Sequence, residues 1–358
     1  MNVLSPELMW IQSRCYRVNM PSLENADRHS EAVKNINYCE DDPEDFQECV
    51  MEADEEGFNV EVLENGRKFQ LKVHVPQIFH AQLIGAKGMT RRRLEQETST
   101  QITIPKIGVP DTIIKVIGNE RRHVITAKRR IDLIVMAGRS KQVFTHFIAI
   151  PFTNDEIQKN FSKFKKDILS DKDIHGIHES LFQNPMKLHL TISTLVLMDN
   201  EDRANAAGYL QECQEIIKDI LKGEELKVKL SGIEYMNDDP SSVDVLYGKI
   251  ESTSLQEIAD RVSNYFSDKG LFQQKSEHVK LHVTLINSLF RDNDDACQES
   301  EVNQQGSKHQ RTSFDATKIL AKFRDFNFGN LTISEIHVST RYSKGSNGFY
   351  EATGIIKI

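Results

Sequence analysis

The chain has 358 residues, of which 39% are hydrophobic and 27% charged, and its formal net charge is −8. This length favours two domains, and the apolar share is sufficient for folded cores. No apolar run reaches the roughly 18 residues of a membrane-spanning helix. The start, MNVLSPELMW, lacks a signal-peptide pattern, and the five cysteines form no zinc or CxxC pattern. We therefore expect reduced cysteines in a cytosolic or nuclear protein that does not bind membranes.

Charge is strongly segregated along the chain. Residues 1–65 hold 4 basic against 16 acidic side chains, residues 66–145 hold 16 against 5, and residues 146–358 hold 25 against 32. A basic middle segment between acidic flanks predicts that the middle segment attracts phosphate groups. The acidic first segment is a candidate to compete for the same basic surface.

Residues 1–62 are expected to form an acidic, mostly disordered arm. The stretch from Glu40 to Glu56 has too few apolar groups to offset the entropy that ordering costs. Residues 1–20 differ, because apolar side chains such as Trp10 gather there. Such a cluster indicates either a segment that docks on a partner protein or one that packs on the chain itself, and both interpretations remain open.

Residues 66–138 predict a small unit with the order β-α-α-β-β-α. A period-two alternation predicts the first strand, and apolar spacing with turn residues predicts the other elements. In chain order we expect a strand at 68–75, short helices at 77–83 and 89–98, strands at 101–106 and 112–118, and a helix from 119 to about 136.

A Gly-x-x-Gly turn separates the two short helices of this unit. Its glycines let backbone N–H groups and helix ends approach a phosphate closely. Lys87 within the turn and two arginines after it add positive charge. The candidate nucleic-acid-binding residues are therefore Ile84, Gly85, Ala86, Lys87, Gly88, Arg91 and Arg92.

The order of elements together with the sequence I-G-A-K-G resembles a type I KH domain over about residues 66–138. The resemblance implies that the Gly-x-x-Gly loop clamps the backbone of single-stranded nucleic acid, with RNA the expected ligand. The alternative is a KH fold that is kept for protein contacts alone.

Residues 143–358 repeat a coarse pattern of strands and helices. Strands are expected at 144–152, 187–197, 225–236, 243–250, 279–290, 326–340 and 348–358, and helices at 155–169, 199–221, 254–268 and 314–324. A polar insertion at 292–312 is expected to be a mobile loop. The repeat has the scale of a domain duplication rather than of a short structural repeat.

Two copies of Lys-Leu-His-x-Thr carry the chemistry of this half, at 187–191 and 280–284. Alternate side chains of a strand share a face, so the leucines pack inward while His189 and Thr191, and likewise His282 and Thr284, line a groove. Two such strands that face each other bring two imidazoles and two hydroxyls to one cavity. Single H-x-S matches at His178 and His337 lack a repeated context, and we interpret His337 as structural.

This set of groups suits cleavage of a phosphodiester. One imidazole can accept the proton of the attacking hydroxyl while the other donates a proton to the leaving oxygen, since imidazole titrates near neutrality. The threonine hydroxyls can donate hydrogen bonds to the non-bridging oxygens as charge develops there. This scheme requires no metal and no cofactor.

The paired motifs resemble the two-histidine (2H) phosphoesterase superfamily over about residues 143–358. The resemblance implies an α+β fold with two antiparallel sheets that face a central cleft. It implies that His189 and His282 are the general acid and base and that Thr191 and Thr284 bind phosphate. It also implies substrates such as RNA ends, 2′,3′-cyclic phosphates or 2′,5′ linkages.

The chain as a whole resembles a family of subunits of nuclear transcription cointegrator complexes. The resemblance rests on VLSPELMWIQSRCYRVN, FTHFIAIPF, GIEYMNDDPSSVDVLY and HVTLINSLFR. It implies a nuclear location, a large helicase subunit as partner, and roles in transcription and in repair of alkylated DNA. Three functional hypotheses remain open: a phosphodiesterase that acts on RNA, a non-catalytic scaffold that binds single-stranded nucleic acid, and a structural adaptor that docks in a larger assembly through residues 1–20. The second and third are compatible with each other.

Overall fold

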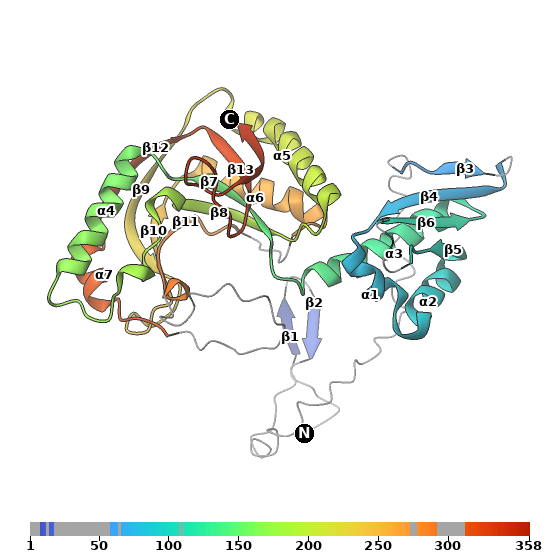
Figure 1. Ribbon diagram of the computed structural model, residues 1–358, viewed down its shortest axis with the longest axis horizontal. Helices are drawn as coiled ribbons and strands as arrows, with labels where there is room; N and C mark the ends of the chain where they lie inside the picture. Colours follow the sequence, from blue (N-terminus) through green and yellow to red (C-terminus); the bar gives the residue numbers. More distant parts are fainter. Residues whose placement is uncertain are drawn as a thin grey trace, which may run out of the picture. The chain divides into compact units, whose positions relative to one another are not determined.

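The computed structural model describes residues 58–63, 66–106, 109, 111–272, 278–291 and 312–358, together with the backbone of 8–11 and 14–17 (Figure 1). The chain divides into two compact units, Met1–Gly57 and Phe58–Ile358. In the first unit β1 (Leu8–Ile11) and β2 (Arg14–Arg17) pair in antiparallel fashion.

Three expectations fall on parts of the chain that lie outside the described residues. They are the docking role of the apolar side chains in residues 1–20, the disorder of the acidic stretch 40–56, and the mobility of the insertion at 292–312. Each of the three stays a prediction.

The basic segment folds as the expected KH domain around a four-stranded sheet of order β3-β4-β6-β5. Its elements are β3 (Glu61–Leu63), β4 (Lys68–His74), a 3-10 turn (Gln77–Phe79), α1 (His80–Ile84), α2 (Met89–Thr98), β5 (Thr100–Thr103), β6 (Ile113–Gly118) and α3 (Arg121–Arg139). The core lies between this sheet and the helices, with Phe79, Ile114 and Val124 fully buried. The α/β order that the sequence predicts is confirmed.

One strand of this domain lies where the sequence predicts a disordered arm. β3 pairs with β4 from Glu61↔Gln70 to Leu63↔Lys68. The Glu61 side chain accepts a hydrogen bond from Gln70 Nε2 at 3.0 Å and one from Lys72 Nζ at 2.7 Å. These bonds lower the pKa of Glu61 and attach the end of the acidic segment to the basic domain.

The second domain is built on eight antiparallel strands in the order β12-β9-β10-β11-β8-β7-β13-β14. The strands are β7 (His146–Pro151), β8 (His189–Leu195), β9 (Leu226–Tyr235), β10 (Val245–Ile250), β11 (His282–Asn287), β12 (Asn327–Ile333), β13 (Glu335–Thr340) and β14 (Ala352–Lys357). Between β11 and β8 the register holds a single pair, Val283↔Leu190, so this narrow joint divides the strands into two four-stranded halves. The expectation of two antiparallel sheets is confirmed in this form.

Helices cover one face of the strands. They are α4 (Asp155–Ser170), α5 (Asn200–Leu221), α6 (Thr253–Asp268) and the short α7 (Thr317–Phe323). Asn154, Asp199 and Ser252 cap the first three, because each side chain accepts a hydrogen bond from the first turn. None of the helices in the described part of the chain is long and apolar enough to cross a membrane.

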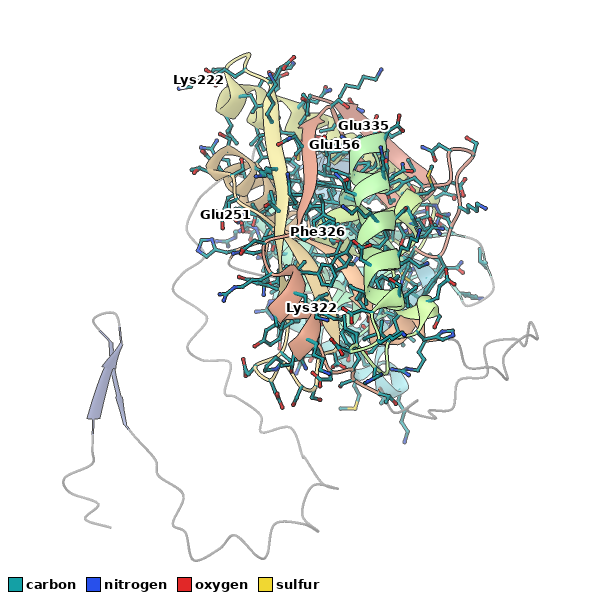
Figure 2. All side chains as sticks on the ribbon, turned by 90° about the vertical axis from the view of Figure 1, so that its left-hand side faces the viewer. Glu156, Lys222, Glu251, Lys322, Phe326 and Glu335 are labelled. Carbon is teal, nitrogen blue, oxygen red and sulfur yellow. The ribbon has the colours of Figure 1, made fainter. Side chains whose placement is uncertain are left out.

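The helices and the apolar faces of the strands share one core. α5 packs on β14 and on α6, and α6 packs on β8. α4 lies across β12, where its Glu156 accepts a hydrogen bond from Asn330 N at 3.3 Å (Figure 2). Since Leu190 and Val283 are fully buried in this core, the alternate residues of β8 and β11 face the other way, away from the core.

Candidate functional site

The two histidines lie at matching places in the two halves of the second domain. His189 is the first residue of β8, and His282 is the first residue of β11. The antiparallel register around Leu190↔Val283 sets His189 opposite Thr284 and Thr191 opposite His282. The structure therefore brings together all four residues that the duplicated motif predicts.

Both imidazoles are held in the same way by the backbone before them. His189 Nδ1 lies 2.7 Å from the Lys187 carbonyl oxygen, and His282 Nδ1 lies 2.7 Å from the Lys280 carbonyl oxygen. A carbonyl oxygen only accepts, so each Nδ1 carries the proton and donates it. Each Nε2 is consequently the nitrogen that remains for chemistry.

An aromatic and a lysine side chain accompany each histidine. The His189 ring lies 5.3 Å from the Tyr350 ring, with Lys187 Nζ 4.6 Å from the centre of that tyrosine. The His282 ring lies 5.5 Å from the Tyr247 ring, with Lys280 Nζ again 4.6 Å away. The duplication thus extends beyond the motif to a Lys-His-Tyr group in each half.

The surroundings of the two tyrosines differ. Tyr247 donates its hydroxyl proton to Glu234 Oε2 at 2.8 Å, and burial together with this carboxylate raises the pKa of Tyr247. The Tyr350 hydroxyl is hydrogen-bonded to the neutral side chain of Gln183, while burial raises the pKa of Tyr350. The Tyr247 hydroxyl is therefore hydrogen-bonded to a carboxylate, and the Tyr350 hydroxyl to an amide.

Burial lowers the pKa values of both imidazoles. Phe147 at 5.1 Å and Phe349 at 6.2 Å crowd the His189 ring. Burial, with a smaller contribution from the charges of His282 and Lys187, lowers the pKa of His189 to about 4, although the hydrogen bond to the Lys187 carbonyl opposes this shift. Burial also lowers the pKa of His282, as does the charge of Lys280. The charge of a protonated His282 thus opposes protonation of His189.

The two threonines of the motifs are available to a ligand. Both side chains are only partly buried, and within the part of the chain that the structure describes neither hydroxyl has a hydrogen-bond partner. A polar group of this kind can donate to a phosphate oxygen. His189, His282, Thr191 and Thr284 together supply the two proton-transfer groups and two hydroxyl donors that a phosphodiester requires.

His337 stands apart from this group. It is 3% exposed on β13, its ring lies 5.7 Å from Phe349, and its Nε2 lies 3.0 Å from Glu335 Oε1. The structural role that we expected from its unpaired sequence context agrees with this buried position.

The Gly-x-x-Gly loop of the KH domain joins α1 to α2 as expected. Gly85 and Gly88 have φ values of 69° and 79°, and Lys87 between them has a φ of 50°. A Cβ atom on Gly85 would lie 2.1 Å from Thr90 Oγ1, whereas one on Gly88 would meet nothing within 4 Å. Gly85 is thus required by close packing, and Gly88 mainly by its backbone conformation.

The candidate nucleic-acid residues form one surface around this loop. Ala86, Lys87 and Arg92 are exposed, and Ile84 and Arg91 are partly buried. Arg91 Nε lies 3.7 Å from Glu95, whereas Lys87 and Arg92 form no ion pair with the described residues. Lys87 and Arg92 are therefore the two cations of this surface best placed to meet a phosphate.

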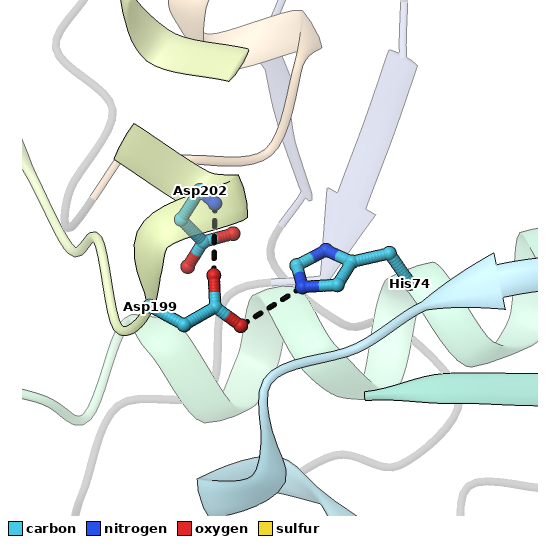
Figure 3. Close-up of side chains that lie close together, drawn as sticks. All are labelled: His74, Asp199 and Asp202. Atoms are coloured by element: carbon cyan, nitrogen blue, oxygen red, sulfur yellow. Dashed lines mark hydrogen bonds and ion pairs between the residues drawn. The ribbon is translucent and has the colours of Figure 1, made fainter. Parts of the chain in front are cut away.

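A third polar group lies where α5 begins, and its residue types are those of a metal site. His74, Asp199 and Asp202 offer ligand atoms within 4.8 Å of one another (Figure 3). His74 Nε2 lies 2.8 Å from Asp199 Oδ2, and Asp199 Oδ1 accepts the backbone N–H of Asp202 at 2.8 Å. Asp202 Oδ1 and Oδ2 accept from Arg139 Nη2 and Nη1 at 2.7 and 2.8 Å. All four carboxylate oxygens are thus engaged, and the group is an ion-pair network that links the KH domain to α5.

Several residues around the site are not among those that the sequence predicts. Lys187 and Lys280 stand inside the repeated motif, so the repeat itself signals them. Tyr247, Tyr350 and Glu234 come from other strands and from the segment before β14, and no spacing connects them with the motif.

Family models match both domains of the chain. The model of the AKAP7 2′5′ RNA ligase-like domain matches residues 144–358, and that of the KH domain matches residues 70–133. The first KH type I domain of human vigilin is similar at 29% identity over 21% of this chain and 79% of its own, with a TM-score of 0.20. LigT of E. coli, in complex with NADP+, is similar at 12% identity over 61% of this chain and 99% of its own, with a TM-score of 0.33.

A relative matches almost the whole length of the chain. The activating signal cointegrator 1 complex subunit 1 of Mus musculus is 36% identical over 365 residues, which cover 99% of each protein. This identity over the full length, with both domains matched, establishes the relationship. The chain therefore belongs to the family of the activating signal cointegrator 1 complex subunit 1 and combines a KH domain with an AKAP7 2′5′ RNA ligase-like domain.

Proposed function

We propose that this protein is a phosphodiesterase that binds single-stranded RNA through its KH domain and acts on an RNA end in the two-histidine site. The observation that carries the proposal is the matched pair of imidazoles, each with Nδ1 bound to a backbone carbonyl and Nε2 left for proton transfer. Binding of a phosphate does not need two imidazoles held in this way, whereas phosphodiester cleavage needs one proton acceptor and one proton donor.

The two histidines take different roles in this proposal. His189, whose pKa lies far below neutrality, is the neutral base and takes the proton of the attacking water or ribose hydroxyl on Nε2. His282 is less crowded and is the acid, which in its protonated form gives the Nε2 proton to the leaving oxygen. After one turnover His189 releases a proton and His282 regains one.

The remaining groups stabilise the phosphate as its charge develops. The hydroxyls of Thr191 and Thr284 donate to the non-bridging oxygens. Lys187 and Lys280 add positive charge near the site, and their contacts with Tyr350 and Tyr247 fix where that charge lies.

A screen of RNA ends tests the proposal. Short RNAs with 2′,3′-cyclic phosphate, 3′-phosphate, 3′-hydroxyl or 2′,5′-linked ends are incubated with the wild-type chain and with the His189→Ala/His282→Ala variant. We expect one class of end to be converted by the wild type and not by the variant. His178→Ala, which alters an H-x-S match outside the repeated motif, should keep full activity. Equal conversion by the wild type and the double variant would contradict the proposal, and binding without conversion would favour the scaffold alternative.

We also propose that the protein is a subunit of a nuclear complex that contains a large helicase subunit. The support is its identity with a relative whose name describes it as a subunit of the activating signal cointegrator 1 complex. Co-purification of a helicase with the tagged full-length chain tests the association. The same measurement on a tagged chain that lacks residues 1–20 tests the docking role of that segment. Undiminished co-purification without residues 1–20 would show that docking occurs elsewhere.

A further inference from the structure

A cavity lies beside the two-histidine site, at the junction of β9, β10 and α7. Its volume is about 1040 Å³. Two of its lining residues connect it to the site: Glu234 accepts the hydroxyl of Tyr247, whose ring lies next to His282, and Lys249 is the registered neighbour of His282 on β10. The cavity, here called the α7 pocket, therefore continues the site on the side of His282.

The α7 pocket combines three kinds of surface. Leu320, Tyr235 and Pro240 give it partly buried apolar walls. Glu234 and Glu251 add carboxylate acceptors, and both lie within 3.5 Å of Lys249 Nζ, which they neutralise in part.

Two further cations line the α7 pocket and, unlike Lys249, are not neutralised by its carboxylates. Lys229 on β9 and Arg324 after α7 are exposed at its margin. Neither forms an ion pair with the residues that the structure describes. Exposed cations beside an apolar wall and carboxylate acceptors match the parts of a nucleotide: a phosphate, an aromatic base, and ribose or base groups that donate hydrogen bonds.

The His189 ring is crowded by aromatic side chains. Phe147, Phe349 and Tyr350 surround the His189 ring, and Lys187 Nζ donates to the Ser343 carbonyl oxygen at 2.9 Å. The segment that carries Ser343 to Tyr350 thus covers the region that would correspond to the α7 pocket.

We propose that the α7 pocket binds the nucleotide next to the reacting phosphate, with its base against Leu320 and Tyr235 and its further phosphate on Lys229 and Arg324. This inference rests on the proposed function and deepens it, because it makes the end of an oligonucleotide the preferred substrate over a free mononucleotide. A volume of about 1040 Å³ accommodates a nucleotide together with an adjoining phosphate, since pockets for small ligands span roughly 300–1000 Å³.

A comparison of substrate lengths tests the α7 pocket. The kcat/KM is measured for a trinucleotide and for a mononucleotide with the same reactive end, with the Lys229→Ala/Arg324→Ala variant and the wild type. We expect the ratio of trinucleotide to mononucleotide kcat/KM to fall about tenfold in the variant, as for loss of one or two phosphate contacts.

The matched control removes two positive charges outside the pocket. Lys322 lies on α7, two residues before Arg324, but its Nζ pairs with Asp171 Oδ2 at 2.7 Å. Lys222 lies at the end of α5 (Figure 2). In Lys222→Ala/Lys322→Ala the ratio is expected to stay at the wild-type value. An equal ratio in both double variants, with unchanged thermal unfolding, would overturn the α7 pocket proposal.

Binding separates this proposal from the proposed function. Fluorescence anisotropy of a labelled trinucleotide is measured on a chain with His189→Ala/His282→Ala, in which Gly88→Asp removes the contribution of the KH loop, with and without the pocket substitutions. Loss of binding with the pocket substitutions supports the α7 pocket even where no RNA end is cleaved. Cleavage that depends on both histidines but not on the pocket residues rejects the α7 pocket and leaves the proposed function standing.

Discussion

Leu190 of β8 and Val283 of β11 face each other across the joint between the two halves of the sheet. Both side chains are fully buried, so the residues on either side of them point away from the core. This single pair accordingly sets the histidine of each motif opposite the threonine of the other motif. The site is shared between the halves, and neither motif makes a complete site alone.

The pH dependence of turnover follows from the two unequal histidines. The pKa of His189 is about 4 and that of His282 is lowered from its usual 6.5, so at neutral pH both rings are largely neutral. The base is then ready, but the acid lacks its proton. We expect kcat/KM to rise as the pH falls below about 7, because His282 gains its proton, and to fall again near pH 4, where His189 loses its function as a base.

A pH series of kcat/KM on the substrate found in the screen of RNA ends checks this expectation. A substrate that lacks a titrating end group avoids a change of its own charge. A constant kcat/KM between about pH 5 and pH 8 would contradict the assignment of the two roles.

The KH loop offers a matched pair of substitutions at Gly88. Asp and Asn adopt positive φ more readily than other residues, and a Cβ at Gly88 meets nothing within 4 Å. Gly88→Asp places a negative charge where a phosphate is expected, whereas Gly88→Asn has the same shape without the charge. We expect affinity for single-stranded RNA to fall at least about tenfold more in the Asp than in the Asn variant, with similar stability.

Electrophoretic mobility shifts at several salt concentrations provide this measurement. Gly85→Asp is the contrasting case, because its Cβ would collide with Thr90 and the loop would have to shift. Equal affinity of the Asp and Asn variants at Gly88 would show that RNA does not contact this loop.

Acid stability depends in part on His146 at the start of β7. The side chain is 4% exposed, and burial with the charge of Arg203 lowers its pKa to about 4. The folded chain therefore resists protonation that the unfolded chain accepts below 6.5, so stability is lost as pH falls from 6.5 towards 4. The loss attributable to His146 amounts to about 3 kcal/mol at its limit.

Urea unfolding of the wild type and His146→Gln at neutral and acidic pH measures this contribution. Gln has no proton to gain in this range, so the variant should lose less stability on acidification. His189 and His282 are retained in both chains and contribute equally. A parallel loss of stability in the two chains would refute the role of His146.

The local signals in the sequence predict most elements of the fold, and their limits have physical causes. Asn154 and Asp199 precede apolar spacing and do cap α4 and α5. The expected strand at 187–197 begins later, because Asn184 caps a 3-10 turn at Pro185–Lys187 and His189 is the first residue in the ladder. The sequence does not predict β3, because three residues are too few to show the alternation of a strand. Only their pairing with β4 makes these residues a strand.

The candidate site is predictable as far as the duplication reaches. The repeat identifies two histidines and two threonines, and their alternation assigns them to one face. The difference between the halves comes from Phe349 and Tyr350, which enter from the segment before β14, and from Glu234 across β10. Cross-strand neighbours of this kind depend on tertiary register, which no local spacing encodes.

A buried ion pair between Arg139 and Asp202 is expected to dominate the stability of the contact between the KH domain and α5. The side chains are 5% and 2% exposed, and two N–H groups of Arg139 meet the two oxygens of Asp202. Because removal of one partner leaves the other as an unpaired buried charge, Arg139→Ala and Asp202→Ala should each lower the free energy of unfolding by about 3–5 kcal/mol. The double variant should lose less than the sum of the two, since neither charge is then left alone.

Urea unfolding of the wild type, the two single variants and the double variant gives the coupling energy. Lys218→Ala is the control, because the pair of Lys218 with Glu215 on α5 is exposed and should contribute less than about 1 kcal/mol. Additive losses in the double variant would mean that the two side chains do not interact in solution.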